Sequence, residues 1–153
     1  MYGKMEKNKG ETNMEYRRFG DTIAVRIDRG EEILEQVRKV AQREQIVFAG
    51  VQALGATDDF TVGVFLPSEK RYVPNHFSGA YEIVSLTGTI GVKDGAPYLH
   101  LHMSAGDADG QVVGGHLNAA RVSVTCEMLI RVIDGAVGRR MDDAIGINLW
   151  NFD

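Results

Sequence analysis

The sequence contains very little cysteine and no long hydrophobic run. Cys126 is the single cysteine among 153 residues, so no disulfide can form within the chain, and a reducing, cytoplasmic compartment is predicted. Because no stretch of about 18 apolar residues occurs, we expect no membrane-spanning helix. The polar N-terminus also lacks the apolar segment of a secretory signal. With 44% hydrophobic and 25% charged residues, the composition is that of one globular domain.

The chain also lacks an excess of positive charge. Its formal net charge is −4 and its isoelectric point is about 5.6, whereas proteins that bind nucleic acid through their own surface usually carry a basic excess. The adjacent arginine pairs in the sequence are Arg17-Arg18 and Arg139-Arg140, and pairs this short are typical of solvated surface. A basic patch assembled in an oligomer stays open as an alternative.

Hydrophobic periodicity predicts one helix and several short strands. Residues 31–44 place their apolar side chains on one stripe, as in an amphipathic helix that covers a sheet. Alternating apolar and polar residues predict strands at 22–28, 60–66, 81–90, 98–103 and 121–132. The pattern favours an α+β fold with a mixed, largely antiparallel curled sheet and one main amphipathic helix. Residues 1–14 are polar and aperiodic, and they are predicted to form a disordered leader.

Three of the four histidines fall within residues 98–117. If this segment begins as a strand, alternation places the side chains of His100 and His102 on the same face. Residues 104–111 are small, acidic and glycine-bearing, which predicts a turn followed by a returning strand. Such a hairpin would bring His116 back beside the other two histidines.

Three neutral imidazoles on a rigid sheet, with no cysteine nearby in sequence, are the ligand set of a zinc-type site whose fourth position stays open. The predicted ligands are therefore His100, His102 and His116, holding zinc or another divalent metal. Gly114-Gly115 would allow close backbone approach beside the third ligand. The alternative is that these are ordinary surface histidines. Asp107–Gly110 resembles the start of a calcium loop, but no glutamate closes it at the twelfth position, so a turn is predicted.

Other reactive side chains have structural interpretations. Cys126 falls on the apolar face of its predicted strand, which favours a small core residue over a nucleophile. His76 follows a proline-asparagine pair and is predicted to lie in a surface loop. Glu82 falls on the same strand face as Val84 and Leu86. A carboxylate there lies either in water at the strand end or partly buried with a partner.

Four motifs carry a resemblance to a known family. They are Phe48–Ala56, Tyr81–Ile90, Leu99–His102 and the Val-Gly-Gly-His-Leu run of Val113–Leu117. In these motifs the chain resembles the PPC domain (plants and prokaryotes conserved domain) of the free-standing prokaryotic type, which we assign to residues 15–153. The resemblance implies a compact domain that forms homotrimers. It also implies that the histidines of the prokaryotic members correspond to His100, His102 and His116.

The same resemblance implies a regulatory association module that is nominally DNA-binding. In plants an AT-hook precedes the domain and contacts the minor groove, whereas the PPC part mediates association with other proteins. Prokaryotic members are called DNA-binding by that analogy. This sequence departs from the plant pattern because it has no Arg-Gly-Arg-Pro hook and is acidic.

The His-x-His pair with a later histidine is also similar to the zinc site of acetolactate decarboxylase. In such a site the metal polarises a carbonyl or activates a water, and a nearby carboxylate moves protons. Glu82 and Glu127 are the candidates for that catalytic carboxylate. The alternative function is therefore a small zinc-dependent lyase or hydrolase that acts on a carbonyl or carboxylate metabolite, and whether the protein is an enzyme stays open.

Overall fold

Strands dominate the computed structural model, which describes residues 14–153. The elements in chain order are β1 (Glu15–Phe19), β2 (Thr22–Asp28), α1 (Ile33–Arg43), β3 (Ala49–Leu66), β4 (Arg71–Lys93), β5 (Ala96–Gly106), β6 (Val112–Val132), β7 (Gly138–Asp142) and β8 (Ile147–Asn151). The predicted leader lies outside the described residues except for Met14, whose side chain is buried.

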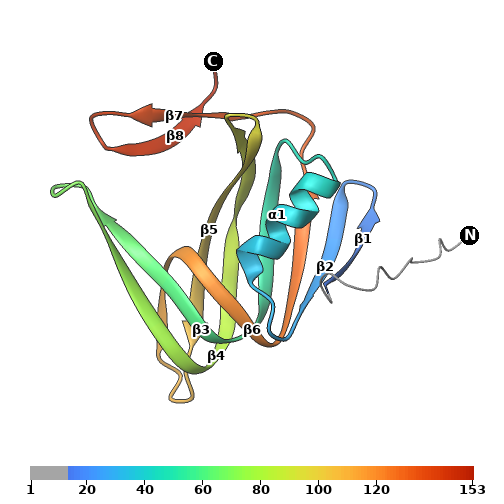
Figure 1. Cartoon of the computed structure of the whole chain (residues 1–153), viewed down its shortest axis with the longest axis vertical. Helices are drawn as coiled ribbons and strands as arrows, with labels where there is room; N and C mark the ends of the chain where they lie inside the picture. Colours follow the sequence, from blue (N-terminus) through green and yellow to red (C-terminus); the bar gives the residue numbers. More distant parts are fainter. Residues whose placement is uncertain (1–13) are drawn as a thin grey trace, which may run out of the picture.

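The strands form a curled sheet in which every pairing is antiparallel. Six strands follow the order β1-β2-β6-β3-β4-β5, and β5 also pairs with β6. As a result β3, β4, β5 and β6 pair in a ring, with α1 lying across the sheet (Figure 1). The last two strands, β7 and β8, make a separate hairpin that packs against β4.

Glycines and bulges let the long strands bend and approach one another closely. A side chain on Gly55 would meet the carbonyl oxygen of Thr125 in β6, and one on Gly88 would meet the carbonyl oxygen of His100 in β5. The register of β3 against β4 shifts between Ala53 and Gly55, and such a bulge bends a strand and increases its twist. Strands of 18 and 23 residues can therefore wrap around the domain.

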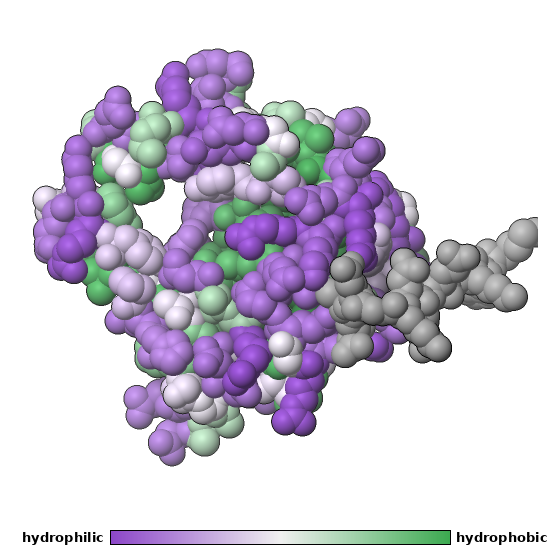
Figure 2. Space-filling view, in the orientation of Figure 1, coloured by the Kyte–Doolittle hydropathy of each residue, from purple (hydrophilic) through white to green (hydrophobic). Residues whose placement is uncertain are grey.

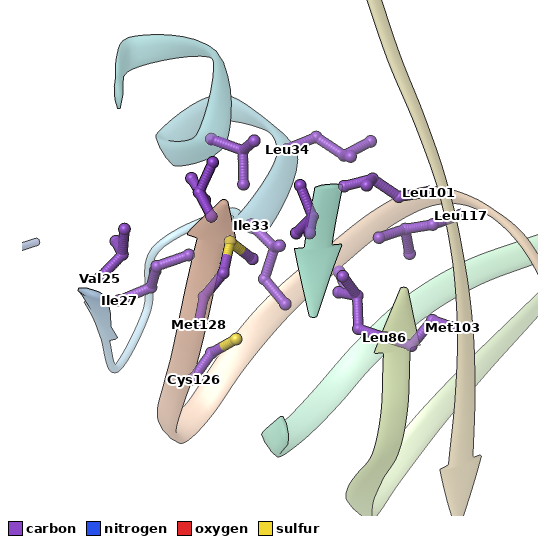
Figure 3. Packing of buried hydrophobic residues seen from close by; sticks show 14 of the residues in the cluster. Val25, Ile27, Ile33, Leu34, Leu86, Leu101, Met103, Leu117, Cys126 and Met128 are labelled. Atoms are coloured by element: carbon purple, nitrogen blue, oxygen red, sulfur yellow. The ribbon is translucent and has the colours of Figure 1, made fainter. Parts of the chain in front are cut away.

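The hydrophobic core lies between the sheet and α1, which packs on β5 and β6. Figure 3 shows Ile33 and Leu34 of the helix directed toward the same cluster as Leu101 and Leu117. Cys126 is buried in this core, and burial raises the pKa of its thiol to about 12, which confirms the prediction of a core residue. The surface seen from the helix side is mostly hydrophilic (Figure 2).

The predicted α+β class is wrong. Strands account for 69% of the structure and helix for 8%, so the molecule is a mostly β domain in which α1 is a short helix of 11 residues. The error has a physical source, because the predicted strands at 60–66 and 81–90 are parts of much longer strands, β3 from Ala49 to Leu66 and β4 from Arg71 to Lys93. Within residues 14–153, no helix is long and apolar enough to cross a membrane.

Candidate metal centre

The structure brings the three predicted histidine ligands together. His100 and His102 lie on β5, and His116 lies directly opposite His102 in the register of β5 against β6. One ligand nitrogen from each ring falls within 4.8 Å of the others. The three side chains share the face opposite the one on which Leu101 and Met103 are buried, so the sheet itself fixes their relative positions.

The glycine pair before His116 makes this closeness possible. A β-carbon on Gly115 would lie 2.6 Å from the carbonyl oxygen of Gly63, and one on Gly114 would lie 2.7 Å from that of Met103. Both distances are shorter than real side chains tolerate, so only glycine permits β6 to lie this close to β3 and β5. The predicted close backbone approach is confirmed.

The distance between the nitrogens of His100 and His102 suits a tetrahedral ion. Nε2 of His100 lies 3.3 Å from Nε2 of His102. Two imidazole nitrogens at the usual zinc distance of about 2.0–2.1 Å and a tetrahedral angle stand roughly 3.3–3.4 Å apart. The donor set also fits, because all three donors are imidazoles, which suit zinc and other late divalent metals. The residues present therefore fit a metal ion of this class.

The cluster favours neutral imidazoles, the form that binds metals. Burial, with smaller contributions from the Arg139 guanidinium and the other two imidazoles, lowers the pKa of His100 to about 4. Burial also lowers the pKa of His116, and the neighbouring His102 adds to that effect. At neutral pH the rings of His100 and His116 are therefore uncharged, and each can bind a metal without first losing a proton.

Acid should destabilise the metal-free protein through His100. Its folded-state pKa of about 4 lies below the ordinary histidine value of 6.5, so the unfolded chain binds more protons between these pH values. The contribution to the free energy of unfolding is complete above about pH 6.5 and is lost as the pH falls toward 4. We expect urea unfolding at pH 4.5 and 7 to show a smaller acid loss in His100→Gln than in the wild type, and equal losses would contradict this.

Arg139 of β7 also reaches the cluster, so the prediction that this arginine belongs to solvated surface is wrong. Its Nη2 lies 3.3 Å from Nδ1 of His100, and its guanidinium carbon lies 4.6 Å from the centre of the Tyr98 ring. The adjacent Arg140 is exposed and lies 3.7 Å from a carboxylate oxygen of Asp153. No spacing or periodicity links residues this far apart, so the sequence held no signal for this contact.

The predicted catalytic carboxylates do not lie at the cluster within this chain. Glu82 is exposed and pairs with Gly106 at the far end of β5. It lies five residues, about 16 Å along β4, from Thr87, the residue that pairs with His102. Glu127 is exposed on β6, which pairs with β2 on one side and β3 on the other. His76 was predicted to lie in a loop, which is wrong: it belongs to β4, where it is exposed and lies 3.2 Å from Asp59.

The fold and the cluster together define a class of protein, an antiparallel β domain closed by β5 and β6 that carries three histidines on those two strands. The family description of the Plants and Prokaryotes Conserved (PCC) domain matches residues 14–134. The chain therefore belongs to this family, which is the PPC domain that the sequence motifs resemble.

Solved structures agree with this assignment. A Bacteroides thetaiotaomicron protein described as a "putative DNA-binding protein" is 27% identical, with a TM-score of 0.88 over 91% of this chain and 97% of its own. A metal-containing protein of Archaeoglobus fulgidus is 31% identical, with a TM-score of 0.82 over 92% and 99% of the two chains. A Pyrococcus horikoshii PPC protein is 30% identical, with a TM-score of 0.77 over 90% and 94%. No curated protein sequence matches this chain.

Proposed function

We propose that this PCC-domain protein is a module that holds one divalent metal ion, zinc by its donor set, at His100, His102 and His116. The observation that carries the proposal is the convergence of three ligand nitrogens within 4.8 Å. The Archaeoglobus fulgidus relative, described as metal-containing, supports it. A bound zinc ion would act as a Lewis acid toward a ligand in its fourth position. Near one zinc ion per chain in elemental analysis of the purified protein would support the site, and none would contradict it.

The proposal includes assembly into a homotrimer in the cytoplasm. A reducing compartment suits a chain whose cysteine is a buried free thiol. The support for assembly is an open groove of about 910 Å³ on the sheet, lined by apolar and charged side chains of β1, β2, β3, β4 and β6. Leu54 is 58% exposed in this groove, Val84 57% and Leu129 44%. A concentration of exposed apolar side chains on one face is typical of a protein interface.

A charge placed in this groove should break the assembly. We expect Leu129→Lys to convert the three-chain particle into single chains in sedimentation velocity, because an unpaired ammonium buried at an interface costs several kcal/mol. Ile145→Lys is the matched control, since Ile145 is 40% exposed but lies in the turn between β7 and β8. A wild type that sediments as one chain would contradict the trimer, and an intact Leu129→Lys trimer would contradict this interface.

Association with DNA is the second candidate function, favoured by the name of the Bacteroides relative. The arginine pairs offer little for phosphate, because Arg18 is paired with Glu44 at 3.1 Å and Arg139 lies against His100. If the protein binds duplex DNA through its surface, the logarithm of the affinity falls linearly with the logarithm of salt concentration. Fluorescence anisotropy with a generic duplex at low and moderate salt tests this function, and absence of binding at low salt would contradict it.

A further inference from the structure

Arg139 is held beside the histidine cluster by several contacts. It belongs to β7 and so lies beyond residues 14–134, which the family description matches. Its Nη2 approaches Nδ1 of His100 at 3.3 Å, and its Nη1 donates to the carbonyl oxygen of Asn148 at 3.3 Å. The guanidinium also lies over the Tyr98 ring, 4.6 Å from its centre. The C-terminal hairpin therefore delivers a positive charge to the edge of the candidate metal centre.

A guanidinium is an unusual neighbour for a metal-binding histidine. Such a histidine normally donates its second N–H to a carboxylate, a carbonyl or water. Arginine has five donors and no acceptor. When His100 binds a metal through Nε2, its Nδ1 carries the proton and cannot accept a hydrogen bond from Arg139. The loaded centre would therefore leave Nη2 of Arg139 without its present partner.

The guanidinium already lacks some of its hydrogen-bond partners. Its Nε is buried and has no partner among the described residues, and the same holds for the side-chain oxygen of the adjacent Asn148. Buried polar atoms without partners are uncommon, and each calls for an explanation such as a bound water, ion or ligand. Within residues 14–153, no carboxylate belongs to the histidine cluster or forms an ion pair with Arg139. A divalent ion here would stand next to a second positive charge that nothing in this part of the chain neutralises.

We propose that Arg139 and the metal together form a binding site for a small carboxylate ligand, an inference that rests on the proposed metal centre. One carboxylate oxygen would occupy the open position on the metal, and the carboxylate would accept hydrogen bonds from the guanidinium. The planar guanidinium matches carboxylates in a two-pronged geometry. The stacked Tyr98 ring and the carbonyl of Asn148 hold it in place, so little conformational entropy is lost when the ligand binds.

Cobalt(II) substitution provides the test, because the visible absorption of the bound ion reports a change of ligand. The protein is loaded with cobalt and titrated with acetate, with inorganic phosphate, and with acetamide as the uncharged analogue of acetate. We expect saturable binding of acetate and none of acetamide. In Arg139→Gln, the acetate affinity should fall about 10- to 100-fold, as expected for loss of a charge-assisted hydrogen bond. Arg139→Lys keeps the positive charge but loses the two-pronged guanidinium geometry, so its affinity for acetate should be intermediate.

The neighbouring Arg140→Gln is the matched control, because Arg140 is exposed and pairs with Asp153 instead. It should bind acetate like the wild type. Wild-type acetate affinity in cobalt-loaded Arg139→Gln would overturn the role of Arg139 while leaving the metal centre intact. Tighter binding of phosphate than of acetate would overturn the carboxylate class. Failure of the wild type to bind cobalt would instead overturn the metal centre itself.

Discussion

His102→Ala should lose almost all of the bound metal. The wild type should carry close to one zinc ion per chain, and the variant close to none, because two imidazoles remain where three converge. Removing a partner outside the ligand shell already costs 10- to 100-fold in metal affinity, and removing a ligand costs more. Elemental mass spectrometry on untagged protein, purified without added metal, measures the content directly. A circular dichroism spectrum confirms that the variant is folded.

The matched control is His76→Ala. His76 is an exposed histidine on β4 that pairs with Asp59 and lies outside the cluster, so this variant should keep its metal. Loss of metal in both variants would mean that the measured zinc is bound nonspecifically by surface histidines. Full metal content in His102→Ala, or none in the wild type, would refute the three-histidine centre.

Gly88→Ala should destabilise the protein by about 3 kcal/mol or more, at the upper end of the range for overpacking. Gly88 of β4 pairs with Leu101 of β5, and an added β-carbon would strike the backbone of His100 and Leu101. Backbone atoms cannot rotate away as a flexible side chain can, so β5 itself must move. Urea unfolding measures the loss of stability. Because β5 carries two of the three ligands, the zinc affinity should fall as well.

Gly50→Ala is the matched control for this prediction. Gly50 is also in a central strand, β3, but a β-carbon added there would have no described atom outside its chain neighbours within 4 Å. The change should be neutral or mildly stabilising, since alanine replaces a more flexible residue in a strand interior. If Gly88→Ala unfolded at the same urea concentration as Gly50→Ala, the close approach of β4 and β5 would be refuted.

The histidine cluster was predictable because it depends on local rules. Alternation along one strand places His100 and His102 on the same face, and a single turn returns the chain to His116. Both relations are encoded within about 20 residues of sequence. The direct opposition of His102 and His116 was not predictable, because register depends on how the strands pack against β3 and β4.

The fold class was not predictable from the same rules. The sequence contains an amphipathic helix and alternating segments that look like short strands, and these favoured α+β. In the structure, β3 and β4 extend well beyond the predicted strands at 60–66 and 81–90, and bulges near Gly55 and between Thr57 and Asp59 let β3 bend without ending. Glycine weakens a strand on average, but here it is required by the neighbouring backbone at Thr125 and His100. That requirement exists only in three dimensions.

Arg139 shows the other limit of sequence reasoning. The contact between Arg139 and His100 joins a terminal hairpin to the central sheet, and no pattern within either segment points to the other. The same limit holds for Glu82 and Glu127, whose residue type suits proton transfer but whose distance from the histidines is set by the fold. The residue type shows which contacts a side chain could make, but only the fold determines which of these contacts form.

The central position of β6 also determines when the sheet can be completed during synthesis. This strand pairs with β2, β3 and β5, yet it is among the last parts of the sheet to leave the ribosome. Until residues 112–132 emerge, those three strands present open edges that can pair with other chains. The third histidine lies on the same strand, so the three histidines of the candidate metal centre come together only when the sheet closes. The candidate metal centre thus forms at the same step that covers these open strand edges.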